Sequence, residues 1–585
     1  MNLQLFTIPS TRLPLIFLIV LLLFTNNVFA NDGNKITLTA KQIEQLKVSS
    51  MIDLLNQLPG VKAGTTTIGF NGFGTKEILV LLDGRVLNDS TSSWRAVNWS
   101  MILVANIEKL EIIKVSTGGR YGSFSNGGVV KITTKQTSGD LQGNIHGSLG
   151  SANYKEISIA TRKKMTNFGL NLSAKWSTSD GFRDNNEKTN YKIGLRFKNH
   201  NKNQIPYLLA LDLSKVDKQS SGPEHRLTPS AYAENENIGA SIILPFKNFK
   251  ISTHFNQFSR LYYNPDSNFL KKLTEKQLKQ RFFMSPNIAT IGNFDLGIDA
   301  IVQGISGLNL QQRTENSLSL YLGKEFVFNN FLASLTDLTL KLDIKGNYYS
   351  EFNNILNKSL SLTLPLPVAT VSFSFSSFNT LPSATKRYYS STTLQGNPNL
   401  KMEEGVSYSI ATSFEVNKSL AVSSSLFYNK STNLIKYTRE GVIGTYENIG
   451  STTTQGLQVD VKYNITTAID TSLGYTYSSE IDDETGNFVT YSPEHQINLK
   501  ITLKPVKGIL IATNTTYKST RYYNSSNTGE LEGQYFRTNL RADYAFSKQA
   551  SAYLKVNNLF DADFHGTAGY PVDPLSYYLG FKYNF

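Results

Sequence analysis

The chain contains no cysteine, so disulfide bonds, thiolate zinc sites, iron–sulfur clusters and a cysteine nucleophile are all excluded. Charged residues make up only 18% of the sequence, which is too few for a disordered chain. A hydrophobic content of 40% is too low for a bundle of membrane-spanning helices. The formal net charge of +13 suits an anionic ligand, nucleic acid or an anionic membrane surface, and does not choose among them.

The motifs of common enzymes are missing or incomplete. The six histidines lie far apart without the spacing of metal ligands, and a lipase-type Gly-x-Ser-x-Gly is absent. Gly69–Lys76 has the glycine spacing of a phosphate-binding loop, but Thr75 and Lys76 stand in reversed order and no long helical pattern follows. We therefore expect that the protein is not an enzyme and needs no cofactor or resident metal ion.

The N-terminal segment is typical of a secretory signal peptide. Arg12 precedes the apolar run Leu13–Phe24, whose roughly twelve residues are fewer than the about 20 that a spanning helix needs. Val28-Phe29-Ala30 supplies suitable residues at the −3 and −1 positions of a cut after Ala30. The alternative, an uncleaved anchor, is disfavoured by the short run and by Asn26 and Asn27. We predict that residues 1–30 are removed and that the mature protein is exported.

Residues 31–138 combine helical and strand-like sequence patterns, as in a small α+β domain. Ser49–Leu58 has helical spacing and stops at Pro59-Gly60, which cannot continue a helix. Ile78–Leu82 is a continuous apolar run, closed by Asp83-Gly84, and indicates a strand buried on both faces. Ile107–Ile113 and Val129–Thr133 are two further predicted strands.

Residues 139–585 have a different sequence pattern, in which apolar and polar side chains alternate. The alternation is clear in residues 192–198, 457–465, 497–504 and 536–546 and recurs about every twenty residues, as in strands with one apolar and one polar face. A soluble β-sandwich would alternate too. Runs of about ten residues, the 30 tyrosines and 34 phenylalanines, and a last strand, Tyr577–Phe585, that ends on an aromatic residue favour a membrane barrel.

These patterns predict a membrane β fold. It is a roughly 22-stranded antiparallel transmembrane β-barrel with an N-terminal α+β plug domain inside the lumen, since so wide a barrel stays open unless something fills it. The predicted division is a signal peptide over 1–30, a plug over 31–138 and a barrel over 139–585.

The chain resembles the TonB-dependent outer-membrane receptors over nearly all of its mature length. Motifs similar to those of the family follow one another in the family's order. They are Asp53–Val61, Phe70–Gly74, Leu79–Val86, Ile107–Ile112, Tyr121-Gly122 and Asn126–Ile132 in the plug, and Gly396–Glu403, Asn448–Gln458 and Val556–Asp561 in the barrel. Overall size and the short stretch between Arg85 and Ile107 are more similar to the family's vitamin B12 receptors than to its larger siderophore receptors.

The resemblance implies uptake of a scarce nutrient, with energy from a TonB-type energy-transducing protein. It implies a monomer in the outer membrane of a Gram-negative cell, in contact with lipid, assembled by the barrel-assembly machinery through Phe585, with no nucleic-acid partner. The family's TonB box corresponds here to Ile36, Thr37, Leu38 and Thr39. Because early plug sequence follows at once, either one segment serves both roles or the box is divergent.

The resemblance also implies two plug arginines that face two barrel glutamates. The matching positions are Asn71 and Lys114 in the plug and Glu403 and Gln458 in the barrel, so one basic and one acidic position have both become neutral. Losing both partners together avoids a buried unpaired charge. We expect an ion pair between Lys114 and Glu403, with Asn71 and Gln458 hydrogen-bonded nearby; the alternative is unrelated drift at four exposed positions.

The ligand is the least defined feature. Phe70, Phe73, Trp94 and Arg95 are the predicted ligand-binding residues of the plug, and an aromatic beside a cation suits a flat anionic chelate. Trp94 could equally anchor its loop to the barrel wall. The basic residues Lys192, Arg196, Lys198, Arg537 and Arg541 point inward in the predicted strands and favour an anion, or else they only face the plug. The predicted ligand is a ferric siderophore, and a corrinoid is the second candidate. The alternative of a different functional class is a porin or a docking receptor for phage or bacteriocin.

Overall fold

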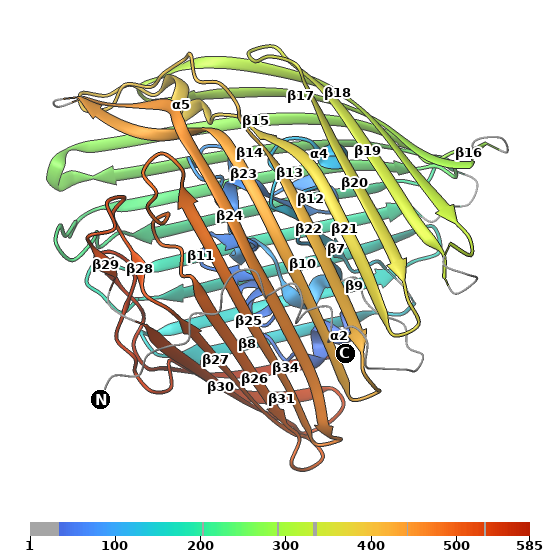
Figure 1. The fold of residues 1–585 in the computed structure, drawn as a ribbon. Helices are drawn as coiled ribbons and strands as arrows, with labels where there is room; N and C mark the ends of the chain where they lie inside the picture. The colour runs from blue at the N-terminus through green and yellow to red at the C-terminus, as the bar shows by residue number, and fades with distance from the viewer. Residues whose placement is uncertain are drawn as a thin grey trace, which may run out of the picture.

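The computed structural model describes residues 34–137, 139–199, 201, 204–288, 292–331, 336–440, 443–531 and 534–585. The predicted signal peptide and residue 138, at the predicted boundary between plug and barrel, lie outside these ranges, so both stay predictions. No helix within the described ranges is long and apolar enough to cross a bilayer. The chain forms a wide β-barrel around a small N-terminal domain, the plug, drawn in blue in Figure 1.

The plug is built on a five-stranded sheet with the order β1-β6-β7-β4-β5, in which only β4 and β7 are parallel. The strands are β1 (Lys35–Thr39), β4 (Ile78–Leu82), β5 (Arg85–Val86), β6 (Ile107–Ile113) and β7 (Gly128–Thr134), with a separate hairpin of β2 (Lys62–Ala63) and β3 (Ile68–Gly69). The helices are α2 (Ala40–Gln45), α3 (Met51–Asn56) and α4 (Gly118–Tyr121), and the 3-10 turns are η1 (Thr75–Glu77), η2 (Trp99–Met101) and η3 (Val104–Asn106).

The plug elements follow from local sequence chemistry. Helix α3 begins where the Ser50 hydroxyl accepts a hydrogen bond from the Asp53 amide, and it ends at Asn56, two residues earlier than the predicted Leu58. All five residues of β4 are buried, which confirms the predicted strand with two covered faces. The predicted strands at β6 and β7 are confirmed as well.

A compact apolar core holds these elements together. Met51, Leu54 and Leu55 of α3 pack with Ile78 and Val80 of β4, each almost without exposed surface. At the rim of this core the indole nitrogen of Trp99 donates to the carbonyl of Thr67 at 3.0 Å, so the buried ring leaves no unpaired polar atom.

Twenty-two antiparallel strands close the barrel, in agreement with the predicted number. They are β8 (Gln142–Gly150), β9 (Tyr154–Lys164), β10 (Phe168–Ser179), β11 (Lys188–Asn199), β12 (Leu208–Gln219), β13 (Tyr232–Pro245), β14 (Phe249–Asn264), β15 (Phe269–Met284), β17 (Gly292–Gly307), β18 (Leu310–Phe328), β19 (Leu338–Tyr349), β20 (Ile355–Pro365), β21 (Ala369–Thr380), β22 (Glu403–Glu415), β23 (Leu420–Glu440), β24 (Ile443–Thr466), β25 (Ile469–Asp482), β26 (His495–Leu503), β27 (Ile509–Lys518), β30 (Tyr535–Ala545), β31 (Ala550–Asn557) and β34 (Ser576–Asn584). Short elements lie between them: η4 (Pro265–Ser267), β16 (Asn287–Ile288), α5 (Ala384–Tyr388), β28 (Arg521–Tyr522), β29 (Glu530–Leu531), β32 (His565–Thr567) and β33 (Tyr570–Pro571).

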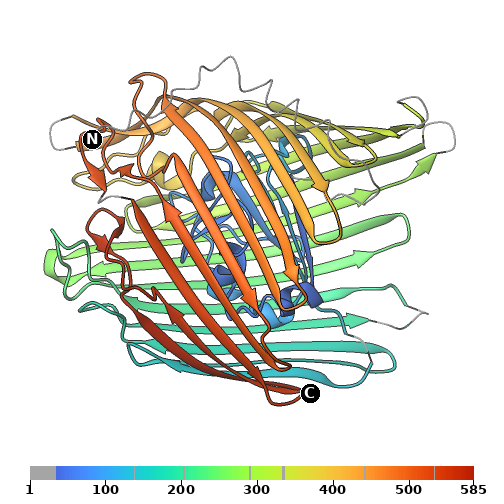
Figure 2. The ribbon, with the colours of Figure 1, turned by 60° about the horizontal axis from the view of Figure 1, so that its bottom comes forward.

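The seam of the barrel joins the last strand to the first. β34 pairs with β8 from Tyr578–Gly150 to Asn584–Asn144. Phe585 then exchanges two backbone hydrogen bonds with Gly143, of 2.8 and 3.0 Å, and its ring covers this glycine. Figure 2 shows the plug enclosed by the closed wall.

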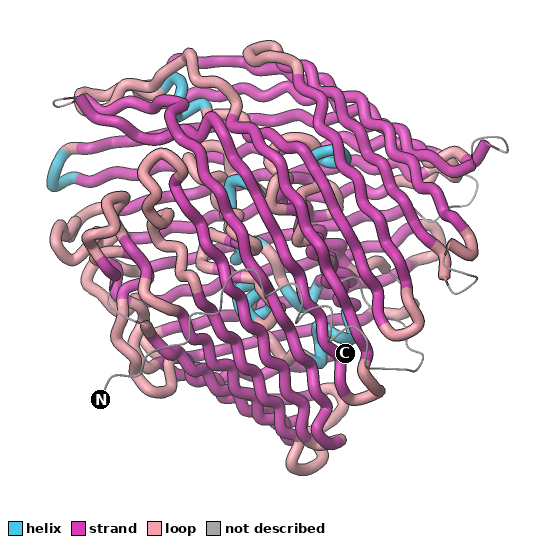
Figure 3. The backbone as a smooth tube through the Cα atoms, in the orientation of Figure 1, coloured by secondary structure: helices cyan, strands magenta, loops and turns pink. Residues whose placement is uncertain are grey.

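The two ends of the barrel differ. Connections at the end near the C-terminus are mostly tight turns, whereas the other end carries long loops with α5 and the β28–β29 hairpin, seen on the left of Figure 3. We call these the turn end and the loop end. β23 and β24, of 21 and 24 residues, are the longest strands and carry the wall toward the loop end.

The strands alternate as predicted, with apolar side chains outside and polar side chains inside. Ile193 on β11 is 51% exposed on the outer surface, whereas its neighbours Lys192 and Arg196 are 8% and 6% exposed. Lys198 reaches the plug, where it donates to Gln136. The inner face is therefore a polar lining for the plug, and the outer face is an apolar band.

Candidate functional site

The plug presents Trp94 and Arg95 to the loop end, as part of the segment over residues 88–98. Trp94 is 49% exposed, and the Arg260 guanidinium of β14 lies 5.9 Å from the centre of its ring. Arg95 is half-buried and stacks over Phe124 instead, 3.6 Å from the ring centre. The predicted pairing of an exposed aromatic with a cation is thus present, but Arg260 rather than Arg95 supplies the cation. Nothing in the sequence places residue 260 beside residue 94.

A small cavity of about 50 Å³ adjoins Arg95. Lys76 of the plug, Lys386 of α5 and Glu403 of β22 line it together with Arg95 and Phe124. The Nε atom of Arg95 is buried and has no hydrogen-bond partner among the described residues. Burial lowers the pKa of Arg95 to about 10, against the opposing charges of Glu275 and Asp89, so the guanidinium remains charged at neutral pH.

Phe70 and Phe73 require a correction. They are 2% and 8% exposed and belong to the apolar core of the plug, so they offer no surface to a ligand. Phe73 also meets Phe378 of β21 edge to face, with ring centres 5.6 Å apart. The ring of Phe73 fills the space that Gly127 leaves free, which holds it inside the plug.

Glu403 joins the plug to the barrel through Lys76, and the predicted Lys114–Glu403 ion pair is wrong. Lys76 donates to both carboxylate oxygens of Glu403, at 2.9 and 3.2 Å. Lys114 lies deeper, where its amide bonds the carbonyl of Asn34 and the Asn34 side chain accepts from Ser409 of β22. Six residues of strand separate Ser409 from Glu403, about 20 Å at roughly 3.3 Å per residue, which a lysine cannot span.

The remaining members of the predicted cluster lie at this deeper level. Asn71 donates to the carbonyl of Lys114 at 2.6 Å, and its own carbonyl accepts from Asn429 of β23 at 3.0 Å. Gln458 donates to Asp460 at 2.5 Å, and Asp460 is the carboxylate on which the charge of Lys114 acts. Asp460 was missed because it lies two residues beyond the family position, on the same face of β24.

Two further ionic contacts hold the plug in the lumen. Arg85 donates to Asp212 of β12 at 2.7 Å, and Arg196 of β11 donates to both Asp212 and Asp83, at 2.9 and 3.1 Å. Their side chains are almost completely buried. The Asp83-Gly84-Arg85 turn was recognised as a motif, but its role as a plug contact was not.

The predicted TonB-contact residues Ile36, Thr37, Leu38 and Thr39 form β1, at the edge of the plug sheet. Ile36 and Leu38 pack against the plug core, and Thr39 caps helix α2 in a capping box with Gln42. A strand at a sheet edge offers its free side to another strand. Their role in binding a partner remains a prediction.

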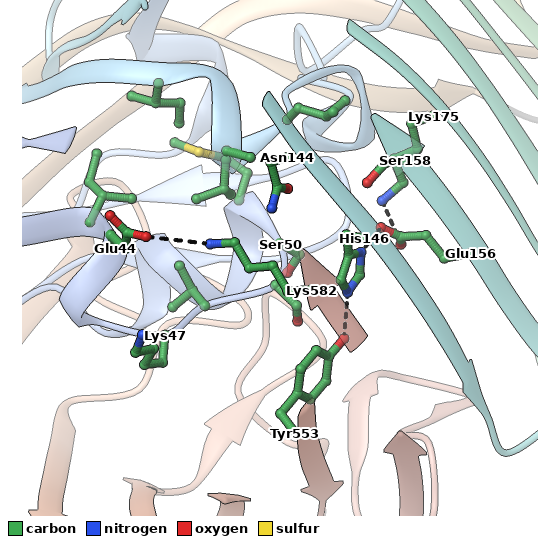
Figure 4. A pocket seen from close by; sticks show the side chains of 18 of the residues that line it. Glu44, Lys47, Ser50, Asn144, His146, Glu156, Ser158, Lys175, Tyr553 and Lys582 are labelled. Carbon is green, nitrogen blue, oxygen red and sulfur yellow. Dashed lines mark hydrogen bonds and ion pairs between the residues drawn. The ribbon is translucent and has the colours of Figure 1, made fainter. Parts of the chain in front are cut away.

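A cavity of about 270 Å³ lies between the plug and the wall (Figure 4). Lys582 of β34 approaches Glu44 of α2 at 3.8 Å from one side. On the other, Tyr553, His146, Glu156 and Lys175 form a chain of contacts of 2.7 to 3.2 Å across β31, β8, β9 and β10. Each ionisable group of that chain has a partner, which is the pattern of a structural network. Within the described ranges, no group of three or more His, Cys, Asp or Glu side chains is placed to hold a metal ion.

A closed wide barrel with a folded domain fixed in its lumen defines a plugged outer-membrane receptor rather than an open pore. The chain belongs to the TonB-dependent receptor family. Residues 113–559 match the family model of the TonB dependent receptor-like β-barrel, and residues 29–129 match that of the TonB-dependent receptor plug domain. The family predicted from the sequence is thus confirmed, and it is a family of the outer membrane.

Two relatives that are similar over nearly the whole chain differ in the function that their names indicate. The vitamin B12 transporter BtuB of Photobacterium profundum is 23% identical over 592 residues, 94% of this chain and 92% of that protein. The iron-regulated outer membrane virulence protein of Vibrio cholerae is 23% identical over 626 residues, 93% of this chain and 91% of that protein.

Two solved structures share the fold of this chain. The receptor PirA of Acinetobacter baumannii superposes with a TM-score of 0.80 at 16% identity, over 95% of this chain and 98% of that one. A mutant ferric enterobactin receptor, PfeA of Pseudomonas aeruginosa in complex with enterobactin, superposes with a TM-score of 0.80 at 16% identity. The superposition covers 95% of this chain and 100% of that one. At such identities the likeness concerns the fold alone.

Proposed function

We propose that the protein binds an anionic ferric chelate, a ferric siderophore, at the loop end and imports it to the periplasm with energy supplied by a TonB-type protein. The observation that carries this proposal is the pair of Trp94 and Arg260, an exposed ring beside a guanidinium at the outer face of the plug. A ring with a cation holds a flat anionic ligand by stacking and charge together. The partner contact is proposed at the free edge of β1, over Ile36–Thr39.

Import of a corrinoid is the second candidate. The observation that favours it is the 23% identity to a vitamin B12 transporter over 94% of the chain. A corrinoid is large and flat, so the exposed Trp94 ring suits it as well. The inner cations are then less easily explained, because they favour a ligand with several anionic oxygens.

Native mass spectrometry of the purified barrel separates the two ligands. The protein is incubated with iron-limited spent medium and, separately, with a panel of corrinoids. A bound mass that contains iron supports the siderophore, and a bound corrinoid supports the second candidate. If nothing binds in either set, both are contradicted and a docking receptor is favoured.

The bound ligand is then tested with Trp94→Ala. We expect weaker ligand binding, whereas Trp176→Ala, which removes a half-exposed tryptophan from the outer face of β10, leaves binding unchanged. Uptake by cells that lack the energy-transducing protein separates active import from a porin. Active import stops in these cells, and passive flow continues.

A further inference from the structure

A second, larger cavity lies between the plug and the wall of strands β26, β27, β30 and β31. Its volume is about 860 Å³. Eight of its lining side chains are basic and only one, Asp53, is acidic. The basic residues are Lys47, Lys62, Lys500, Lys518, Arg521, Arg537, Arg541 and Lys555.

Two of these cations are neutralised by carboxylates. Lys555 donates to Asp53, with 2.9 Å to each oxygen. Arg541 makes two hydrogen bonds to Asp543, of 2.8 and 2.9 Å. Lys500 donates to the amide oxygen of Gln57, at 2.6 Å, which gives it a partner but no opposite charge.

Lys62, Lys518, Arg521 and Arg537 form a group that we call the basic cluster. Within the part of the chain that the structure describes, none of the four makes an ion pair. Arg521 is only 6% exposed and is held by the carbonyls of His565 and Gly566 at 3.0 and 3.3 Å. The Nε atom of Arg537 is buried without a hydrogen-bond partner.

The four cations lie close enough to act on one another. Burial, together with the charges of Lys518 and Arg521, lowers the pKa of Lys62 to about 8, and only Glu480 opposes them. Asp573 is the carboxylate on which Arg537 acts, without an ion pair. Buried like charges that make no ion pair are unfavourable, and an anion between them lowers this penalty.

The position of the cluster relates it to the path of a solute. The loop-end side of the cavity is lined by Tyr491, Phe564 and Gly566. Toward the turn end, the cavity adjoins the one in Figure 4, since Lys47, Val48, Thr65 and Arg541 line both. The smaller cavity reaches the turn at Ser547–Gln549. The two cavities thus follow one side of the plug from the loop end to the turn end.

We propose that the basic cluster is an internal binding site for a small oligoanion, a solute with several carboxylate or phosphate-type oxygens, between the loop end and the plug. The inference rests on the proposed function, in which an anionic chelate passes the plug. The site differs from the Trp94–Arg260 pair because its donors come from β2 of the plug, from β27 and β30 of the wall and from β28 of the loop-end hairpin. Arginine and lysine donors from several directions hold multiple anionic oxygens with charge-assisted hydrogen bonds.

Isothermal titration of the full-length mature protein in detergent tests this site, with citrate as the carboxylate probe and inorganic pyrophosphate as the phosphate probe. We expect saturable binding of at least one probe, weakened about tenfold by Lys62→Gln and by Arg537→Gln because each removes a charged donor. Binding of citrate alone or of pyrophosphate alone identifies the anionic group.

The matched control is Lys188→Gln. Lys188 also lines an internal cavity, the smaller one, and makes no ion pair among the described residues. Its variant should bind like the wild type, and Lys62→Arg should restore most of the affinity that Lys62→Gln loses. Absence of saturable binding, or equal weakening by Lys188→Gln, overturns the proposal, since lumen charge in general would then explain the effect.

The outcome is distinguishable from that of the proposed function. If citrate or pyrophosphate binds through Lys62 while mass spectrometry finds no nutrient ligand, the internal site stands and the proposed substrate does not. If a ferric chelate binds and neither citrate nor pyrophosphate does, the proposed substrate stands and the internal site does not. Circular dichroism and resistance of the plug to protease establish that each variant is folded.

Discussion

Asp53 of plug helix α3 accepts hydrogen bonds from Lys555 of barrel strand β31 through both of its carboxylate oxygens, each 2.9 Å from Nζ. The pair is mostly shielded from solvent, with side-chain exposures of 26% and 19%. It fixes α3 to β31, six strands around the wall from β12 of the Arg85–Asp212 contact, so removing it should loosen the plug.

We predict that Asp53→Asn lowers the free energy of plug unfolding by about 2 kcal/mol, because Lys555 loses its charge partner. Urea unfolding followed by hydrogen exchange of the α3 amides measures the change. The exposed pair Asp470–Lys504 at a turn is the control, and Asp470→Asn should cost about 0.5 kcal/mol or less. Equal costs for the two variants would contradict a structural role of the Asp53 contact.

The same contact predicts an acid dependence. Burial alone would raise the pKa of Asp53, but the charge and hydrogen bonds of Lys555 outweigh it and hold the pKa at about 2. Since this value lies below the ordinary 3.8, the contribution of Asp53 to stability is fully present above about pH 4 and is lost as the pH falls through about 2. Unfolding midpoints of wild type and Asp53→Asn should differ at pH 6 and converge near pH 2; a constant difference would refute the assignment.

Phe73 should matter for stability and not directly for ligand contact. Because its ring is buried in the plug core and meets Phe378, Phe73→Ala should lower the free energy of plug unfolding by about 3–5 kcal/mol. The matched control is Phe560, which is 74% exposed. Phe560→Ala should lower the free energy of unfolding by less than about 0.5 kcal/mol. A stable Phe73→Ala plug with weakened ligand binding would restore the original prediction that Phe73 contacts ligand.

Gly60 and Gln458 test the contact between plug and β24 by steric means. A Cβ atom on Gly60 would lie 2.1 Å from the Gln458 amide oxygen, and the backbone there has φ +66°. Gly60→Ala should therefore destabilise the plug, and Gln458→Ala in the same chain should recover part of the loss. The backbone strain, about 1 kcal/mol, should remain. Failure of the second change to help would mean that the two residues are not in contact.

Anion binding at the basic cluster should weaken at alkaline pH. Lys62, with a pKa of about 8, is largely protonated at pH 7 and largely neutral at pH 9, so the affinity for citrate should fall over this interval. Lys518, Arg521 and Glu480 are the charged groups that act on it. The Lys62→Arg variant should show a flatter profile, since arginine keeps its charge. Parallel profiles would assign the titration to another group.

Much of the fold could be predicted because it depends on patterns repeated many times. Alternation repeated over many segments indicates a barrel even where single segments such as residues 497–504 are ambiguous. The run Ile78–Leu82 likewise defines a buried strand by its own composition. The ends of elements were less certain, as in α3, where Asn56 rather than Leu58 is the last helical residue.

The contacts between plug and barrel could not be predicted to the same degree. The height of a residue in the lumen depends on strand register and on where the plug rests, and neither is local in sequence. Lys114 was therefore paired with Glu403 rather than placed beside Asp460, and Lys76 was overlooked. Arg260 was missed for the same reason, since only the closed barrel brings β14 to the loop that carries Trp94.

The seam between β8 and β34 has a consequence for how the molecule is made. Asn144 and Asn584, joined across it, are 440 residues apart in the chain, so this contact forms only after the last strand has been delivered. Until then both terminal strands are open edges that invite pairing with other chains. The plug, whose partners lie on β11, β12, β22, β24 and β31, must find them within the same interval. Pairing with other chains is therefore most favoured before the final ten residues have joined the sheet. A chain that loses these residues would form a curved open sheet in place of a closed barrel.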